Sequence, residues 1–167
     1  VMVSTSLGAV NGILFKNASA LEDATKLNVI IFDKTGTLTI GKPEVVEMVT
    51  AEGITEDVVL LAAAAVEQGS AHPLAQAILR RASTLTVVAP TGFKSIDGMG
   101  AQAETADGTV FLGNRLLMDT QQLALGPLET DAARLQGEGR TVVHVSQNGR
   151  VIGLIAIADA VRPTAKA

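Results

Sequence analysis

Blocks of apolar and polar positions along the 167-residue chain predict its elements. Residues 1–26 read as helical with a break, and Asn17 is a suitable N-cap for a short helix that follows it. Residues 28–32, Asn-Val-Ile-Ile-Phe, form a largely apolar and mostly β-branched run, which is typical of a strand buried on both faces. A polar, glycine-punctuated loop is expected over 34–43.

Beyond residue 43 the pattern predicts helices mixed with strands. Asp107-Gly108 and Asn148-Gly149 are hairpin signals between expected strands, and Ser70 is expected to cap a helix that holds a His-Pro pair. This order favours an α+β fold, an antiparallel β-sheet flanked by helices. In chain order, the expected elements are strand 44–49, helices 55–68 and 70–81, strands 93–96, 101–105 and 109–112, helix 127–136, and strands 141–146 and 150–158.

Single residues on these strands carry expectations of their own. Phe93 and Phe111 fall on predicted strands and are expected in the core. His144 alternates with valines, so we expect a half-exposed sheet residue without a role.

Composition narrows the function classes. The chain has 13 Lys and Arg against 17 Asp and Glu, a net charge of −4, and it lacks Cys, Trp and Tyr. The acidic balance argues against a nucleic-acid partner, and the lack of cysteine excludes a zinc ribbon or a thiol nucleophile. No apolar run reaches the ~18 residues of a membrane span. No signal peptide is recognisable, and the Val at position 1 indicates an internal fragment. We expect this fragment to be monomeric.

The first chemical motif follows the apolar run at 28–32. Asp33 lies where a buried strand meets its loop, and a carboxylate there can attack a phosphoryl group to form an acyl phosphate. Hydroxyls and backbone N–H groups of the loop suit phosphate oxygens. Residues 33–39, Asp-Lys-Thr-Gly-Thr-Leu-Thr, resemble the phosphorylation signature of P-type ATPases at all seven positions. The resemblance implies that Asp33, Lys34 and Thr35 are catalytic and that Asp33 and Thr35 bind Mg²⁺.

Two other readings of this region are weaker. Residues 36–43 nearly spell a P-loop, but Pro43 replaces the Mg²⁺-binding Ser or Thr and a strand follows instead of a helix. A haloacid-dehalogenase phosphatase carries Asp-x-Asp, and its second Asp speeds hydrolysis of the acyl phosphate. Thr35 stands at that position here, which favours a longer-lived phosphoenzyme.

A second set of positions lies in the middle of the chain. A Glu precedes a His-Pro pair by five residues, and a Gly-x-Gly and a Gly-Asn follow. Singly, such residues are more often structural, and a weak Rossmann fingerprint at 98–103 leads into a strand and is discounted. Together they resemble the nucleotide-binding domain of heavy-metal (class IB) P-type ATPases. The residues concerned are Glu67, His72, Pro73, Gly98, Gly100, Gly113 and Asn114.

The resemblance also assigns roles to these residues. It implies that Glu67 and His72 orient adenine, that Gly98 and Gly100 let the backbone approach the phosphates, and that Gly113 and Asn114 complete the pocket. Other P-type classes stack an aromatic ring on adenine, whereas this class is expected to use Glu, His and Gly contacts. Ala71 departs from the family, which often has Glu there.

The implied organisation has three parts. Residues 1–43 would be the membrane-proximal and N-terminal part of an incomplete haloacid-dehalogenase-like α/β phosphorylation domain, 44–158 a nucleotide-binding domain, and 159–167 the hinge back. ATP and Mg²⁺ are the expected cofactors. The partners would be the remaining phosphorylation, actuator and transmembrane domains of a membrane protein that moves copper, zinc or a similar metal from its cytoplasmic side. A non-catalytic nucleotide-binding module, with Asp33 a relic, is the alternative.

Overall fold

The computed structural model describes residues 2–166, without the side chains of Met2, Ser4, Lys34, Thr35 and Lys166. The chain divides into two compact units, Val1–Asp33 and Lys34–Ala167. Within the described residues, no helix is both long and apolar enough to cross a membrane.

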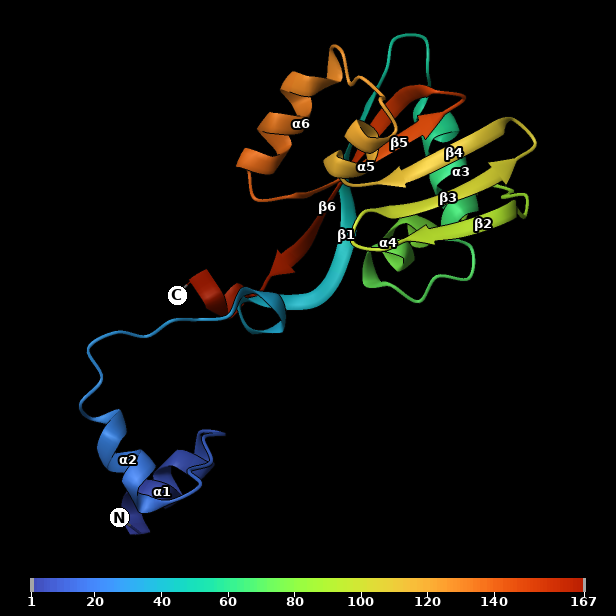
Figure 1. Ribbon diagram of the computed structural model, residues 1–167. Helices are drawn as coiled ribbons and strands as arrows, with labels where there is room; N and C mark the ends of the chain where they lie inside the picture. The colour runs from blue at the N-terminus through green and yellow to red at the C-terminus, as the bar shows by residue number, and fades with distance from the viewer. Residues whose placement is uncertain (1, 167) are drawn as a thin grey trace. The chain divides into compact units, whose positions relative to one another are not determined.

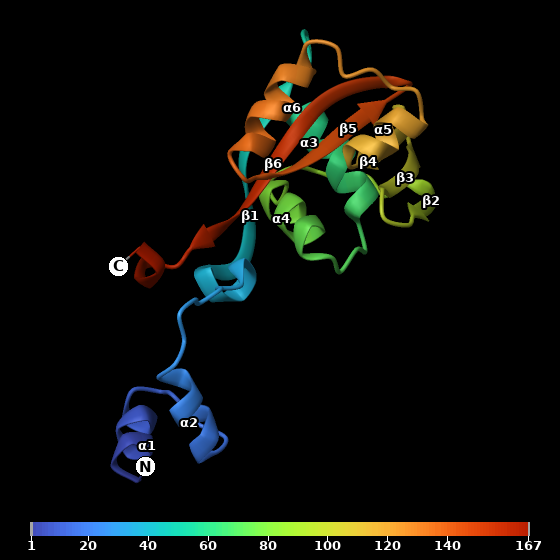
Figure 2. The ribbon, with the colours of Figure 1, turned by 60° about the vertical axis from the view of Figure 1, so that its left-hand side comes forward.

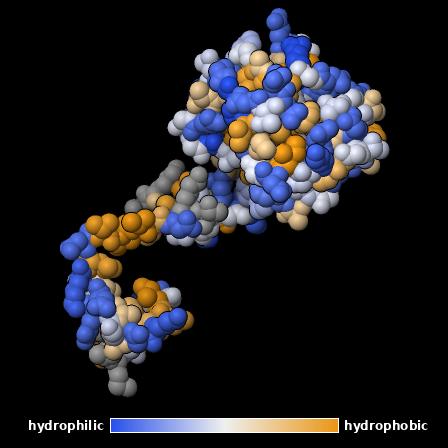
Figure 3. Space-filling model, in the orientation of Figure 1, coloured by the Kyte–Doolittle hydropathy of each residue, from blue (hydrophilic) through white to orange (hydrophobic). Residues whose placement is uncertain are grey.

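The first unit contains two short helices, α1 (Met2–Val10) and α2 (Ala18–Ala24). Asn17 caps α2 as predicted, because its Oδ1 accepts a hydrogen bond of 2.8 Å from the Ala20 N–H. The strand predicted over 28–32 is wrong: the run is not a strand, and Ile31 is 91% exposed. Figure 3 shows this run in the orange of apolar residues. A strand buried on both faces needs neighbours, and no described residue pairs with this one.

The second unit is built on a six-stranded antiparallel sheet with the order β1-β6-β5-β4-β3-β2 (Figure 1). This confirms the predicted α+β architecture. A single π-helical turn, Lys34–Leu38, leads into the sheet, and a 3₁₀ turn, Pro163–Lys166, follows it. The strands are β1 (Thr39–Thr50), β2 (Thr91–Ile96), β3 (Gly100–Thr105), β4 (Gly108–Gly113), β5 (Thr141–Gln147) and β6 (Arg150–Val161).

Helices cover both faces of this sheet (Figures 1 and 2). On one face, α3 (Glu56–Glu67) and α4 (Pro73–Arg81) enclose the first core cluster with the sheet. On the other, α5 (Arg115–Thr120) and α6 (Leu128–Gly137) enclose the second. The sequence pattern predicts α3, α4 and α6 but does not predict α5, which is only six residues long.

A polar junction joins the two ends of this unit. The carboxylate of Asp159 accepts hydrogen bonds from the Thr39 hydroxyl at 2.6 Å and from the Gly41 and Lys42 N–H groups at 2.9 Å. These bonds hold the pKa of Asp159 below its ordinary value, the Thr39 bond most of all. Arg162 donates to the Gly36 carbonyl at 3.0 Å. This junction explains why β1 begins at residue 39, so that the loop predicted over 34–43 is wrong from that residue onward.

His144 is buried, and the prediction of a half-exposed residue is wrong. It lies on β5, an internal strand of the sheet with helices over both faces. Side chains that point to either face of this strand are therefore buried. The side chain is 1% exposed, and its Nδ1 lies 3.3 Å from the Gly113 carbonyl oxygen. Burial lowers the pKa of His144, and the charge of Arg115 adds to this, while the Gly113 bond and the charges of Glu129 and Asp119 act in the opposite direction.

The buried imidazole makes stability depend on pH. The unfolded chain, with its ordinary value of 6.5, binds the proton more readily than the folded one. Stability should therefore fall as the pH drops below about 6.5. We expect His144→Leu to flatten this dependence, as measured by urea unfolding at pH 7.5 and 5.5. An equally steep loss of stability in the variant would contradict the assignment.

Candidate functional site

A cavity of about 450 Å³ opens where α3 ends, α4 begins, the β2–β3 turn passes and β4 ends. Such a volume lies within the range of small-molecule sites. Positions that are spread over 67–114 in the sequence come together on its wall. All six residues predicted to bind nucleotide line it: Glu67, His72, Gly98, Gly100, Gly113 and Asn114.

Glu67 and His72 lie at facing helix ends. Burial raises the pKa of Glu67, while a hydrogen bond from Ser70 and the neighbouring His72 act in the opposite direction. His72, and not the predicted Ser70, is the N-cap of α4, since its Nδ1 accepts a 3.2 Å bond from the Leu74 N–H. An accepting Nδ1 places the proton of the neutral ring on Nε2. The pair therefore offers an acceptor carboxylate beside a donor N–H.

Asn114 ties the β2–β3 turn to the end of β4. Its side-chain amide donates to the Gly98 carbonyl at 2.9 Å, and its backbone N–H donates to the Met99 carbonyl at 2.8 Å. Its Oδ1 accepts from the Leu117 N–H at 3.1 Å and so caps α5. Asn114 thus shapes the cavity by holding the turn.

Gly98 and Gly100 are both predicted to bind nucleotide, but the structure requires glycine at the two positions for different reasons. A Cβ on Gly100 would overlap the Leu112 carbonyl oxygen and lie 2.6 Å from the Gly113 Cα. Gly100 is therefore required by the close approach of β3 and β4. Gly98 has φ +69° and open space where its Cβ would be. Of the two, Gly98 is the one that leaves room for a ligand.

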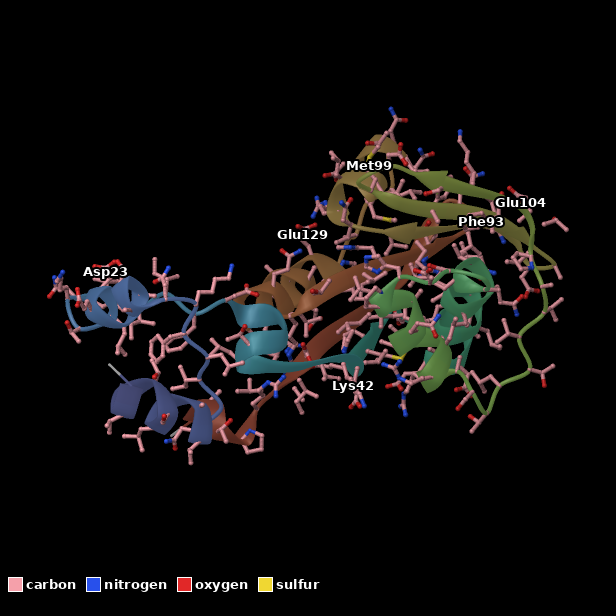
Figure 4. All side chains as sticks on the ribbon, turned by 90° about the horizontal axis from the view of Figure 1, so that it is seen from below. Asp23, Lys42, Phe93, Met99, Glu104 and Glu129 are labelled. Atoms are coloured by element: carbon pink, nitrogen blue, oxygen red, sulfur yellow. The ribbon has the colours of Figure 1, made fainter. Side chains whose placement is uncertain are left out.

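The structure adds an aromatic residue to the cavity. Phe93 lines it and is 54% exposed, so the prediction that Phe93 lies in the core is wrong. Figure 4 labels Phe93 on β2 and Met99, which also lines the cavity, in the turn after it. Phe111 packs against the second core cluster, as predicted. The sequence pattern missed the difference because it does not show that β2 is the edge strand of the sheet.

The phosphorylation motif lies apart from the cavity in the sequence. Asp33 is exposed and ends the first unit, whereas the side chains of Lys34 and Thr35 lie outside the described residues. Among the side chains that the structure describes, no group of three or more His, Cys, Asp or Glu could hold a metal ion. The Mg²⁺ set of Asp33 and Thr35 stays a prediction.

Helix α4 also reaches the polar junction. Arg80, in its last turn, donates a 2.6 Å bond to the Pro43 carbonyl oxygen on β1. The adjacent Arg81 instead lies 3.9 Å from Glu56 on α3. This short helix therefore lines the cavity with its N-cap His72 and with Leu74, and contacts β1 through Arg80 near its last residue.

Curated relatives match nearly the whole chain. It is 41% identical over 169 residues to the probable copper-exporting P-type ATPase V of Mycobacterium tuberculosis (strain CDC 1551 / Oshkosh), covering 99% of this chain and 22% of that protein. It is 42% identical over 167 residues to the probable copper-exporting P-type ATPase of Archaeoglobus fulgidus, covering 98% and 20%. The chain spans about a fifth of the length of these relatives.

A family model of the haloacid dehalogenase-like hydrolases matches residues 27–167. The chain belongs to that family and, within it, to the heavy-metal P-type ATPases. The resemblance inferred from the two motifs is thereby confirmed.

Solved P-type ATPase structures share the fold. A zinc-transporting PIB-type ATPase in the E2.Pi state has a TM-score of 0.75 at 36% identity, covering 96% of this chain and 26% of that one. The catalytic domain of the CPx-ATPase CopB-B, studied for conformational changes upon nucleotide binding, has a TM-score of 0.68 at 27% identity, covering 95% and 54%. The N-domain of HMA8, a copper-transporting P-type ATPase, has a TM-score of 0.56 at 32% identity, covering 69% and 99%.

The two glycines of this P-type ATPase turn should respond differently to alanine. Gly100→Ala forces a Cβ into backbone atoms and should lower the free energy of unfolding by about 3 kcal/mol. Gly98→Ala meets open space and should cost only about 1 kcal/mol, for its left-handed backbone. Urea unfolding of the two variants measures both. Equal losses would contradict the difference in their packing.

Proposed function

We propose that the cavity is an ATP site and that the protein to which this chain belongs transfers the γ-phosphoryl group of ATP to Asp33. One observation carries the first part. Residues singled out by sequence motif alone, from Glu67 to Asn114, line a single cavity of nucleotide size. The CopB-B domain, whose fold is similar, is described as changing conformation upon nucleotide binding, and this supports the same conclusion.

The groups on the cavity wall match the parts of ATP. The Glu67 carboxylate is an acceptor for the exocyclic amine of adenine, and the Nε2–H of His72 is a donor for a ring nitrogen. Gly98 sits in a left-handed turn with space beside it, where backbone N–H groups can meet phosphate oxygens. Gly113 and Asn114 hold this turn in place from β4.

The proposed reaction at Asp33 is a single displacement. A carboxylate oxygen of Asp33 attacks the γ-phosphorus, the bond to the β,γ-bridging oxygen breaks, and ADP leaves as an acyl phosphate forms. Mg²⁺ neutralises phosphate charge in such transfers and is commonly held by one or two carboxylates plus the phosphates themselves. Asp33 suits one of those carboxylates, and Thr35 would lie beside it.

For the whole protein we propose ATP-driven export of copper, zinc or a similar metal. The names of the relatives support this, and so does the replacement of a second Asp by Thr35, which slows hydrolysis of the acyl phosphate. The chain would work on the cytoplasmic side of a membrane, together with phosphorylation, actuator and transmembrane parts of the protein.

Titration with ATP tests the cavity. We expect amide chemical-shift changes at Gly98, Gly100, Gly113 and Asn114, because their backbones line the site. Residues of a second cavity near Val58, on the same unit, should not respond. An absence of shifts around the first cavity would refute the ATP site.

Glu67→Gln tests the adenine contact. Replacing this half-buried carboxylate should weaken ATP binding by about tenfold, because a charged acceptor is lost. Glu56→Gln is the matched control, since Glu56 begins the same helix and is exposed at its other end. Isothermal titration calorimetry of both variants gives the comparison, and equal affinities would contradict the role of Glu67.

Labelling tests Asp33 and separates the pump from a non-catalytic module. In the full-length protein, γ-labelled ATP should leave an acid-stable, hydroxylamine-labile label that Asp33→Asn abolishes. A protein that binds ATP without forming this label would be the nucleotide-binding module instead.

A further inference from the structure

The wall of the proposed ATP cavity carries carboxylates but no Lys or Arg. Its two acidic lining residues are Glu67 and Asp97. The nearest arginine in the sequence, Arg115, does not line the cavity, and its guanidinium forms ion pairs with Asp119 and Glu129. Because the phosphates of ATP are negatively charged, this wall offers them no permanent positive charge as a partner.

The two carboxylates lie at different parts of the proposed ligand. Glu67, at the end of α3, is placed at the adenine. Asp97 directly precedes Gly98 in the β2–β3 turn, where the phosphates are placed. A negative charge at this second place repels a free triphosphate by Coulomb interaction.

The turn itself does not depend on the Asp97 side chain. The Met99 N–H donates a 3.0 Å bond to the Ile96 carbonyl, and the Asn114 amide holds the Gly98 carbonyl. Aspartate is common in turns because its side chain can accept bonds from nearby backbone N–H groups. Within the described residues, the Asp97 carboxylate takes part in no hydrogen bond or ion pair. It is exposed and free to meet a ligand.

A divalent cation on the triphosphate reverses the effect of this charge. Mg²⁺ is commonly held by one or two carboxylates together with substrate phosphates, and it keeps several waters. Asp97 supplies one such carboxylate. Among the described side chains, no group of three or more His, Cys, Asp or Glu could hold a metal ion by itself. We therefore expect the cation to enter the cavity with the nucleotide and not alone.

We propose that Asp97 makes the cavity select ATP complexed with Mg²⁺ over free ATP, an inference that rests on the proposed ATP site. Its carboxylate repels uncomplexed phosphates and attracts the cation that joins them, directly or through a bound water. Glu67 and His72 recognise the base, and Asp97 recognises the charge state of the phosphates. The selection concerns binding in the cavity and not the transfer to Asp33.

Calorimetry of the 167-residue chain tests the selection. The wild type should bind ATP with Mg²⁺ about tenfold more tightly than ATP in EDTA. Asp97→Asn removes the charge and keeps the shape, so it should bind free ATP about fivefold more tightly than the wild type and leave only about a twofold preference for the Mg²⁺ form. Adenosine, which has no phosphate, should bind both proteins equally. A preference that survives unchanged in Asp97→Asn overturns the proposal.

Two further variants control for charge and for position. Asp107→Asn makes the same change of net charge in the Asp-Gly turn of the next hairpin, which lines the second cavity and not the first. It should keep the wild-type preference, and so should Asp97→Glu, which retains the carboxylate. If Asp107→Asn loses the preference as well, net charge is responsible and Asp97 is not. Urea unfolding of the variants checks that each is folded.

Mn²⁺ gives a readout of place. It accepts the same oxygen ligands as Mg²⁺ and is paramagnetic, so it broadens the NMR signals of nearby amides. With ATP and Mn²⁺ together, the amides of residues 97–99 should broaden, whereas that of Asp107 should not. Mn²⁺ without ATP should broaden neither turn. Broadening elsewhere in the cavity but not at 97–99 contradicts the role of Asp97.

The outcomes separate this inference from the function on which it rests. If the wild type binds ATP neither with Mg²⁺ nor without it, the ATP site fails and Asp97 has no phosphates to select. If it binds both forms with equal affinity, the ATP site stands and the selection by Asp97 is wrong.

Discussion

Gly100 on β3 and Gly113 on β4 pair so closely that neither residue can carry a Cβ. Other features of the site depend on it. Because the two strands meet so closely, the Asn114 N–H reaches the Met99 carbonyl and the turn at Gly98 is drawn against the end of β4. His144 on β5 pairs with Gly113, and its Nδ1 lies 3.3 Å from the Gly113 carbonyl oxygen, so it contacts β4 at the same residue. A shift of one strand would disturb all of these bonds.

The polar side chains of the site also lie at the ends of helices. His72 caps α4, Asn114 caps α5, and Glu67 is the last residue of α3. Helix ends leave backbone groups without partners inside the helix, so polar side chains are needed there for folding alone. In this cavity the residues proposed to bind the ligand therefore also stabilise the fold, and a substitution at His72 or Asn114 removes a helix cap.

The sequence predicts the parts of the fold that depend on local chemistry. Turn residues such as Asn148-Gly149, helix caps such as Asn17 and the periodicity of α3 and α6 suffice for most elements, and glycine, histidine and glutamate motifs suffice to select the cavity residues. Position within the sheet is not local information. The pattern thus misplaces Phe93, which lies on the edge strand, and His144, which lies on an internal one. It also makes a strand of 28–32, whose apolar residues have no partner within the described chain.

The hydrogen bond from Arg80 to the Pro43 carbonyl oxygen connects α4 to β1. The helix has nine residues and spans about 13 Å, from the cavity at His72 to the strand that enters the Asp159 junction. Over that length an α-helix behaves as a stiff rod. A displacement of its first turn would therefore be transmitted through Arg80 to Pro43 on β1. The helix thus links the wall of the cavity to β1 by a short and rigid connection.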